Sequence, residues 1–535
     1  MKKVYISIAS LLLCGSMLMA QSPANRTSKT IVADVLAQMP AEQQAEYNKL
    51  INDLSSTGEE GVLMLINKIN APGKGSNSNV DYALSGLTHY VMAKGEENAR
   101  LATANAYLKA LDKVSDRETK AFIIRQLQLL GKDECVDTLA SYLNDESLSG
   151  PAARALSAIR TDNAKKVLVA SLMRRSGTPK TQKDIIRAIA DVQIADAENV
   201  LKVMLGSSDE NMQKEVLYAL SRVGSKASLS DLAAAAEKAG YKMEKTGANE
   251  AYIALIKRVL EQGDTKDAEK AANDLLKKST KAGMTQTREA ALQILLAAKP
   301  EAATKNLLSA LKDTDKGYRN AALNFASGFA DQNVYIEVMK HMLKAKPEVK
   351  VDILNWIGRE SKCPSKHDVI KNLELRFDLP ARQVLLDQLK DKDFYVQQAA
   401  VWALVKIGDK SVIPVLADLL KSNDKQVILL GQDALMAFNG DIDQAVAKVI
   451  PSASDAGKIA GLELLAIRMA DANLNTVLKL PFSTIKLDRS LLNGICYDDQ
   501  VALLYKNIVA VMQNLGHKVV AEGVETQEEI DLLKQ

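Results

Sequence analysis

The sequence predicts an all-α protein, a right-handed α-solenoid of antiparallel helix pairs. Two observations carry this prediction. Apolar residues recur with the 3.6-residue period of a helix in short paired segments, and such pairs follow one another along most of the chain. Aromatic residues make up only 4% of the 535 residues, and glycine and proline are too sparse for a fold built from many β-turns. A chain of this length also exceeds one ordinary compact core.

The clearest helix pair spans Asp391–Asp424. Gly408 separates its two halves and can adopt the positive φ that ends a helix. Asp409 and Ser411 then offer turn and N-cap oxygens, and Pro414 suits the first turn of the second helix because it lacks only an N–H that has no intrahelical partner there. The predicted buried stripes are Val396, Ala399, Ala400, Ala403, Leu404 and Ile407 in the first helix, and Val412, Val415, Leu416, Leu419 and Leu420 in the second.

The same pattern recurs in Arg125–Leu143, Val216–Ala236 and Ala290–Leu311. The turn glycines Gly131, Gly224 and Gly408 lie 93 and 184 residues apart, close to three and six units of about 31 residues. This pattern resembles HEAT repeats of the short bacterial type, the PBS-lyase-like HEAT repeats, most clearly in QQAAVWALVKIGDKSVIPVLADLL. The resemblance implies an array that binds a protein partner or another extended ligand.

The N-terminus predicts export. Lys2 and Lys3 precede an apolar run that ends near Met19, and Ala20 is a small residue suited to cleavage. We therefore expect residues 1–20 to be a signal peptide, and the mature protein to be periplasmic or secreted without a membrane span. Residues 21–79 are predicted to form a helical cap and a flexible loop, and residues 80–470 the HEAT-like array.

Two further features qualify the array. A glycine-bounded polar insert at Gly240–Gly263 predicts a longer repeat or a bend. The net charge of +3, with no basic run, argues against nucleic acid as the main partner. No spacing of histidines and cysteines suits a metal, and no motif indicates a cofactor. Cys135 is predicted to be a small buried residue.

Residues 471–535 have a different character. Strand-like residues at Pro481–Asp488 and Lys518–Glu522 alternate with helical patterns at Asp498–Leu515 and Glu525–Lys534. This order is β-α-β-α, whereas the preceding chain is α-α throughout. The change predicts a second kind of structure at the C-terminus.

Two motifs in this tail, LNTVLKLPFSTIKLDRSLL and LGHKVVAEGVET, resemble the end of an EAL domain, the cyclic-di-GMP phosphodiesterase family. The resemblance implies a TIM-like barrel with carboxylate-held metal ions. It matches Lys486 and Glu522 to the active-site lysine and glutamate. The signature E-x-L strand and the paired-aspartate segment DDFGTGYS are absent, and about two of eight βα units are present. We therefore expect no active catalytic residue and no metal.

Several interpretations remain open from the sequence. The favoured one is an exported, non-enzymatic scaffold, and the alternatives are a protein related to cyclic-di-GMP phosphodiesterases or a truncated HEAT-array protein whose missing domain acts on carbohydrate. The tail is either a foreign sequence joined near Asp471–Asn473 or a recruited C-terminal cap. The two tryptophans, Trp356 and Trp402, are either binding anchors or packing residues between repeats.

Overall fold

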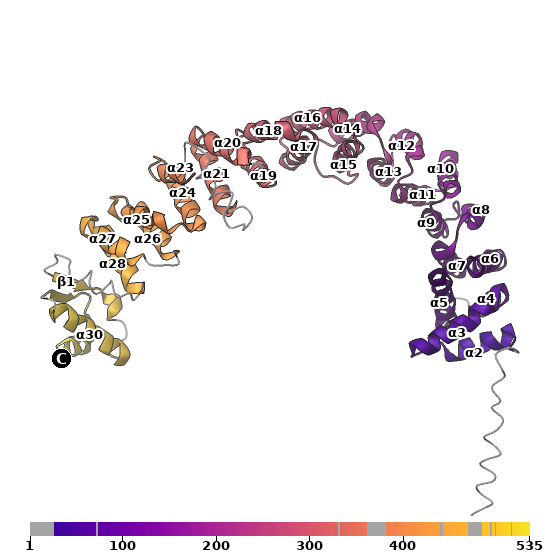
Figure 1. The fold of residues 1–535 in the computed structure, drawn as a ribbon, viewed down its shortest axis with the longest axis horizontal. Coiled ribbons are helices and arrows are strands. Elements are labelled where there is room, and N and C mark those ends of the chain that lie inside the picture. Colours follow the sequence, from indigo (N-terminus) through magenta and orange to yellow (C-terminus); the bar gives the residue numbers. More distant parts are fainter. Residues whose placement is uncertain are drawn as a thin grey trace, which may run out of the picture. The chain divides into compact units, whose positions relative to one another are not determined.

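In a computed structural model, the chain forms successive helix pairs followed by a small α/β segment (Figure 1). The structure describes residues 26–70, 73–329, 332–360, 381–438, 442–468, 484–492, 495–497, 499–514 and 516–534. The predicted signal peptide and the predicted junction at 471–473 lie outside these residues. The chain divides into two compact units, one ending at Glu301 and one beginning at Ala302, and each is described by itself.

In the first unit, consecutive helices alternate between two layers, as Figure 1 shows. The first layer contains α3 (Gln44–Ser56), α5 (Ser78–Lys94), α7 (Arg117–Leu130), α9 (Ser149–Ile159), α11 (Pro179–Val192), α13 (Glu210–Val223), α15 (Ala248–Glu261) and α17 (Thr285–Ala298). The second layer contains α4 (Gly58–Ile66), α6 (Glu97–Lys113), α8 (Val136–Ser141), α10 (Asp162–Arg174), α12 (Glu198–Met204), α14 (Leu229–Lys238) and α16 (Thr265–Lys281). Helix α2 (Ser28–Gln38) packs on α3, α4 and α5, so the predicted cap continues the stack.

The second unit repeats this arrangement. Its first layer is α19 (Lys316–Ala326), α21 (Pro347–Glu360), α24 (Phe394–Ile407), α26 (Lys425–Met436) and α28 (Asp455–Arg468). Its second layer is α18 (Ala303–Ala310), α20 (Gln332–Leu343), α23 (Ala381–Gln388), α25 (Ile413–Ala417) and α27 (Asp443–Val449). Short 3₁₀ turns join the layers at η2 (Asp133–Cys135), η3 (Ala195–Ala197), η4 (Lys226–Ser228), η5 (Pro300–Ala302), η7 (Lys410–Val412), η8 (Asp418–Lys421) and η9 (Ile450–Ser452).

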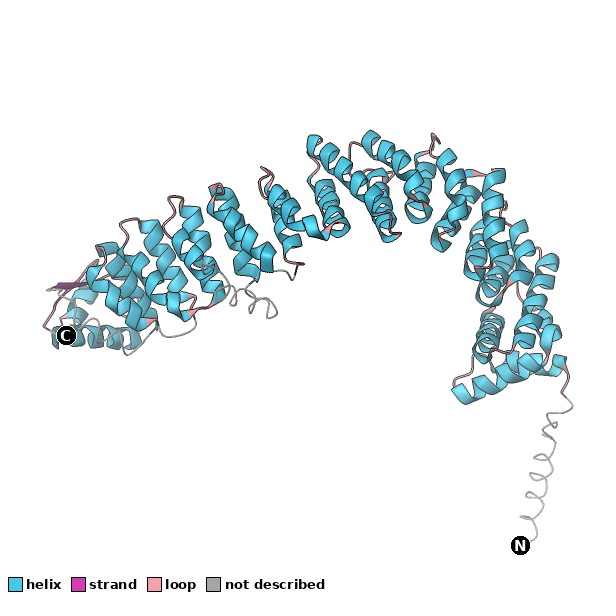
Figure 2. Cartoon of the chain, turned by 45° about the horizontal axis from the view of Figure 1, so that its top comes forward, coloured by secondary structure: helices cyan, strands magenta, loops and turns pink. Residues whose placement is uncertain are grey.

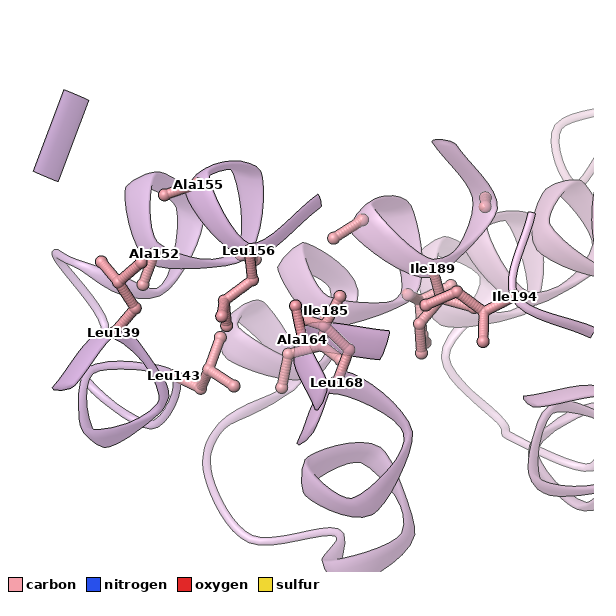
Figure 3. Close-up of a cluster of buried hydrophobic side chains, with 14 of the residues drawn as sticks. Leu139, Leu143, Ala152, Ala155, Leu156, Ala164, Leu168, Ile185, Ile189 and Ile194 are labelled. Atoms are coloured by element: carbon pink, nitrogen blue, oxygen red, sulfur yellow. The ribbon is translucent and has the colours of Figure 1, made fainter. Parts of the chain in front are cut away.

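Apolar side chains from consecutive pairs form the core. Figure 3 shows one part of it, where α8, α9, α10 and α11 bring buried aliphatic side chains together. The labelled residues are Leu139, Leu143, Ala152, Ala155, Leu156, Ala164, Leu168, Ile185, Ile189 and Ile194. No single helix pair can bury both of its apolar faces, so each pair needs its neighbours. Helices dominate the described chain, as Figure 2 shows.

The predicted pair at Asp391–Asp424 is confirmed in outline. Gly408 ends α24 with a φ of 73°, and Asp409 accepts a hydrogen bond from the Ser411 N–H at 2.9 Å. The first stripe is buried except for the half-buried Ile407. The second helix is shorter than predicted, because it splits into η7, α25 and η8, and Pro414 lies at the start of α25.

The prediction from turn glycines needs two corrections. Gly131 and Gly224 have φ values of −70° and −63°, so neither uses the left-handed region. A side chain would clash there instead, since a Cβ would lie 2.6 Å from the Leu127 oxygen or 2.5 Å from the Leu220 oxygen. Between Gly224 and Gly408, the described chain contains five further first-layer helices rather than six, because three of the spacings exceed 31 residues, most of all the 47 residues from Pro347 of α21 to Phe394 of α24.

The insert at Gly240–Gly263 is confirmed as part of a longer repeat. Gly240, Tyr241 and Gly247 all have positive φ, so the chain leaves α14 through an irregular loop before α15 begins. Cys135 is confirmed as fully buried, and burial raises the pKa of its thiol to about 12. Within the described residues, no helix combines the length and the apolar character that a bilayer crossing requires.

The tail forms the predicted β-α-β-α order. Strand β1 (Thr484–Leu487) pairs in parallel with β2 (Lys518–Ala521), and α30 (Asp499–Asn514) makes the crossover between them. The short turn η10 (Arg489–Leu491) follows β1, and α31 (Gln527–Leu533) ends the described chain. The small core of the tail consists of tail side chains only: Leu487, Leu492, Ile495 and Tyr505.

Candidate functional site

The structure brings the two motif-matched residues of the tail together. The parallel register pairs Leu487 with Ala521, and the Glu522 N–H donates to the Leu487 oxygen at 2.9 Å. Glu522 therefore leaves the end of β2 beside Lys486 on β1. The Lys486 ammonium nitrogen lies 2.5 Å from Glu522 Oε1. The sequence motifs alone did not predict that these two side chains form an ion pair.

A second ion pair lies beside the first. Arg489, which follows β1, binds both carboxylate oxygens of Glu525. Gly523, between the two glutamates, has a φ of 78°, and a Cβ there would lie 2.8 Å from Arg489 Cβ. Both pairs are largely exposed to solvent, so each contributes little to stability. The strand ends thus carry two cations and two carboxylates that neutralise one another.

These residues do not fit the metal site that an EAL domain implies. Glu522 Oε1 already accepts the Lys486 ammonium, and no group of three metal-ligating side chains occurs in the described part of the chain. A divalent cation in such a site prefers several oxygen ligands at once. We therefore derive no catalytic step through a metal here.

The predicted binding role of Trp356 does not fit the structure, because its side chain has no exposed surface. Its ring stacks on Tyr335 at 4.8 Å between centroids, and its indole N–H donates to Ser327 Oγ at 2.8 Å. Glu360 accepts from both the Ser327 and Tyr335 hydroxyls. Trp356 therefore joins α19, α20 and α21 as a packing residue.

Trp402 lies on α24 and is half-buried. It occupies the same place in its helix as Tyr218 in α13, since VWALVKIG aligns with LYALSRVG and Gly408 with Gly224. Tyr218 is 45% exposed. The binding role of Trp402 stays a prediction, and this alignment directs attention to Tyr218.

A groove of about 520 Å³ opens beside Tyr218 and is lined by residues of α13 and α15. Its existence follows from side-chain size: the position in α15 that corresponds to Tyr218 is Ala254, so a large side chain on one helix faces a small one on the next. The lining residues are Gln193, Lys214, Tyr218, Ser221, Arg222, Thr246, Gly247, Glu250, Ala251, Ala254, Lys257, Arg258 and Glu261.

Two arginines fix one wall of this groove. Arg222 donates from Nε to the Ala190 oxygen at 3.0 Å, and Arg258 donates from Nε to the Gly224 oxygen at 3.1 Å. Each therefore satisfies a carbonyl at the C-terminal end of the preceding first-layer helix, where carbonyls lack intrahelical donors. The Arg222 guanidinium also lies 5.8 Å from the Tyr218 ring centroid. The ring is thereby held at the edge of the groove.

A second cavity, of about 650 Å³, lies on the other side of the Gly240–Gly247 loop. Its lining mixes charged side chains with small and apolar ones, and Lys202 of α12, Glu210 of α13 and Asp231 of α14 are among the charged residues. Thr246 at the end of this loop lines both cavities. Gly247 also lines the groove beside Tyr218, and Ala248 also lines the second cavity. Sequence reasoning identified the insert but not the two cavities beside it, because neither cavity is made by local sequence.

Comparisons with known proteins agree with these two kinds of structure. The HEAT-repeat family matches residues 169–253 and 359–436, and the EAL domain family matches residues 445–535. The EAL match begins inside α27, whereas the structure packs α27 on α25 and α28 on α26 as in the preceding pairs. The predicted resemblance to HEAT repeats and to an EAL domain is confirmed. No curated protein matches the chain.

Several solved structures are similar to the chain at low identity. Yeast importin-β (Kap95p) is 12% identical, with 92% of this chain and 68% of that chain covered and a TM-score of 0.41. Kap121p bound to RanGTP is 12% identical, with 91% and 57% covered and a TM-score of 0.44. Importin-β crystallised with ammonium sulfate is 13% identical, with 94% and 72% covered and a TM-score of 0.35. The chain therefore contains two segments similar to HEAT repeats and a C-terminal segment similar to an EAL domain.

Proposed function

We propose that this chain is an exported, non-enzymatic scaffold that binds an extended segment of a protein partner along its first layer. The observation that carries the proposal is the groove beside Tyr218, which combines an exposed aromatic ring with a floor of small residues. Exposed aromatic side chains beside small-residue pockets are typical of binding hot spots. The packed first-layer helices of the first unit, α9 and α11 on one side and α17 on the other, extend the surface beside this groove.

The EAL-like tail supports the non-enzymatic part of this proposal. Only the Lys486–Glu522 pair of the family's active-site residues is matched, and the two side chains neutralise each other. The match covers residues 445–535, which is a small part of the chain. We infer that the tail is retained as a vestigial or chimeric segment without phosphodiesterase activity.

Binding is tested by selecting peptides from an unbiased library on the purified full chain and measuring their Kd. We expect selected peptides to bind wild type and the Tyr497→Ser variant equally, since Tyr497 is an exposed tyrosine of the tail. Tyr218→Ser should weaken binding about tenfold or more, because the aromatic edge of the groove is removed. If the library yields no binder, the scaffold proposal is wrong.

Catalysis is tested by incubating the full chain with cyclic-di-GMP and a divalent cation. We expect no turnover above buffer. Turnover that disappears in Glu522→Gln but persists in Glu525→Gln would overturn the non-enzymatic proposal, because only Glu522 is matched to the family's catalytic glutamate. This pair of variants separates true catalysis from a contaminating enzyme.

Export and the junction are tested by mass spectrometry of the native protein. A mature N-terminus just after Ala20 would support export, and an uncleaved Met1 would contradict it. A peptide that spans residues 467–486 would show that the HEAT-like and EAL-like segments are translated as one chain. If the HEAT-like and EAL-like segments are found only as separate proteins, the two segments are not translated as one chain.

A further inference from the structure

One surface position recurs at the same place in four consecutive first-layer helices. In each helix, a single exposed residue is preceded by two buried residues and followed by two more. These exposed residues are Arg125 on α7, Arg154 on α9, Arg187 on α11 and Tyr218 on α13. Because the four helices pack side by side in this order, the four side chains form one column across the layer. We call this set the Arg–Tyr column.

The arginines of the column differ in their partners. Arg187 donates from Nε to Glu215 Oε2 at 2.9 Å, and Glu215 lies three residues before Tyr218 on the next helix. The position that corresponds to Glu215 is Asp184 for Arg154 and Pro151 for Arg125. Asp184 Oδ2 already accepts from Ser149 Oγ at 2.7 Å and from the Lys180 ammonium at 3.5 Å.

Arg125 and Arg154 therefore have no ion-pair partner among the described residues. Burial raises the pKa of the Asp81 carboxyl on α5, and the positive charge of Arg125 partly offsets this rise. Arg125 and Asp81 form no ion pair among the described residues. Two exposed guanidinium groups thus lie on adjacent helices without an ion pair among the described residues, while the third is bound to Glu215. At the end of the column lies the groove beside Tyr218.

We infer that the Arg–Tyr column binds an extended acidic peptide segment. Two of its carboxylates, three residues apart, bind Arg125 and Arg154, and an apolar side chain six residues after the second carboxylate enters the groove beside Tyr218. This inference rests on the proposed scaffold function and names the partner chemistry and the site.

The spacing follows from geometry. Packed helices lie about 8–10 Å apart, and an extended peptide rises about 3.3 Å per residue. Every third residue of the peptide therefore meets the next helix. Positions 1 and 4 meet Arg125 and Arg154, position 7 meets the neutralised Arg187–Glu215 pair, and position 10 meets the groove. A guanidinium binds a carboxylate through two parallel hydrogen bonds, which favours acidic residues at the first two positions.

A peptide fits this surface better than a nucleic acid does. Carboxylates lie between and beside the cations, at Glu215 on α13 and at Glu250 and Glu261 in the lining of the groove. A phosphate backbone carries an uninterrupted row of negative charges and would meet these carboxylates as well as the arginines. A peptide with two acidic residues and an apolar one matches the alternation of charge and groove.

The test is fluorescence anisotropy of a labelled ten-residue peptide with the full chain. The peptide has glutamate at positions 1 and 4, glutamine at 7 and leucine at 10. We expect it to bind at least fivefold more tightly than a peptide of the same composition with glutamate at 1 and 2. Arg125→Gln with Arg154→Gln should weaken Kd about tenfold, and raising the ionic strength should weaken wild-type binding.

The matched control is Lys166→Gln with Arg174→Gln, which removes two exposed charges from α10 in the second layer. This variant should change Kd less than about twofold. Equal binding of the two peptides, or equal binding by the arginine variant, would overturn the inference. A single-stranded DNA probe that binds more tightly than the peptide and depends on the same arginines would also overturn it.

Failure of this inference is distinguishable from failure of the scaffold proposal. If unbiased library selection yields peptides that depend on Tyr218 but not on Arg125 and Arg154, the acidic-segment inference fails and the scaffold proposal stands. If selection yields no peptide at all, both fail.

Discussion

The helical repeats and the C-terminal tail use the same interaction for different purposes. Between α19 and α21, Arg319 binds Asp352 at 2.7 Å with each side chain only 4% exposed. Between β1 and β2, Lys486 binds Glu522 at 2.5 Å with side chains 66% and 49% exposed. Both pairs join neighbouring elements of a layer. The difference in burial gives the first a large effect on stability and leaves the second nearly neutral.

The surroundings explain this difference. Arg319 also donates to the Asp313 and Thr314 oxygens at 3.0 Å, so its buried charge is fully bound at the helix junction. Among the described residues of the tail, four buried side chains form its core, and each of the two described strands has one open edge. Repeats bury interactions by stacking, whereas the described two-stranded sheet leaves its strand ends exposed to solvent.

The largest expected effect is loss of the buried tryptophan in the repeats. Trp356→Ala removes a fully buried ring and its hydrogen bond to Ser327, so it should lower the free energy of unfolding by about 3–5 kcal/mol. Trp402→Ala is the control, since Trp402 is half-buried and should cost clearly less. The measurement is urea unfolding followed by circular dichroism. Equal losses for the two variants would contradict the packing role of Trp356.

The second prediction concerns the buried ion pair. Asp352→Ala should lower the free energy of unfolding by about 3 kcal/mol, because Arg319 would remain buried without its carboxylate. The double variant Arg319→Met with Asp352→Leu should regain most of this loss, since it removes both charges. Thermal unfolding by calorimetry measures both. A double variant as unstable as the single one would show that the pair acts through more than its charges.

The third prediction uses pH. Burial raises the pKa of Asp391. The Asp393 N–H and the Lys350 ammonium, 2.6 Å from Asp391 Oδ2, lower this pKa by more than burial raises it, so the folded pKa lies below its usual value. A lowered folded pKa adds stability above the unfolded pKa of about 4, and this stability is lost as pH falls through the folded value.

The measurement compares wild type with Asp391→Asn by urea unfolding between pH 6 and pH 2. Wild type should be more stable at pH 6, and the difference should shrink below about pH 4, the unfolded pKa of an aspartate. A difference that grows as pH falls would contradict the sign of the pKa shift.

The smallest effect is expected in the tail. Lys486→Ala removes an exposed ion pair and should change the free energy of unfolding by less than about 0.5 kcal/mol. Hydrogen exchange of β1 and β2 measures this locally. Protection of the strands that collapses in this variant would show that the pair organises the tail, and would weaken the contrast with the repeats.

Much of the fold was predictable because it depends on residues that are close together in the sequence. The apolar stripe of α24, the end at Gly408 and the turn at Asp409 follow from side chains within a few residues of one another. The strand and helix order of the tail followed for the same reason. The number of repeats between Gly224 and Gly408 could not be predicted in this way, because a fixed period cannot account for the longer spacings from α13 to α15, from α15 to α17 and, most of all, from α21 to α24.

The sites were less predictable. Trp356 and Trp402 look alike in sequence, and only stacking of α20 against α21 buries the first completely. Lys486 and Glu522 were matched by motif, yet their ion pair depends on the parallel register that places the ends of β1 and β2 together. The groove beside Tyr218 depends on the small Ala254 of the following repeat.

The sequence by itself thus determined the helix pairs, their repetition and the different secondary structure of the tail, because helical period, turn residues and motifs are properties of neighbouring residues. The tertiary structure alone decided which exposed residues share a column. Arg125, Arg154, Arg187 and Tyr218 follow one another at 29, 33 and 31 residues along the chain. Only the side-by-side packing of α7, α9, α11 and α13 brings them onto one surface.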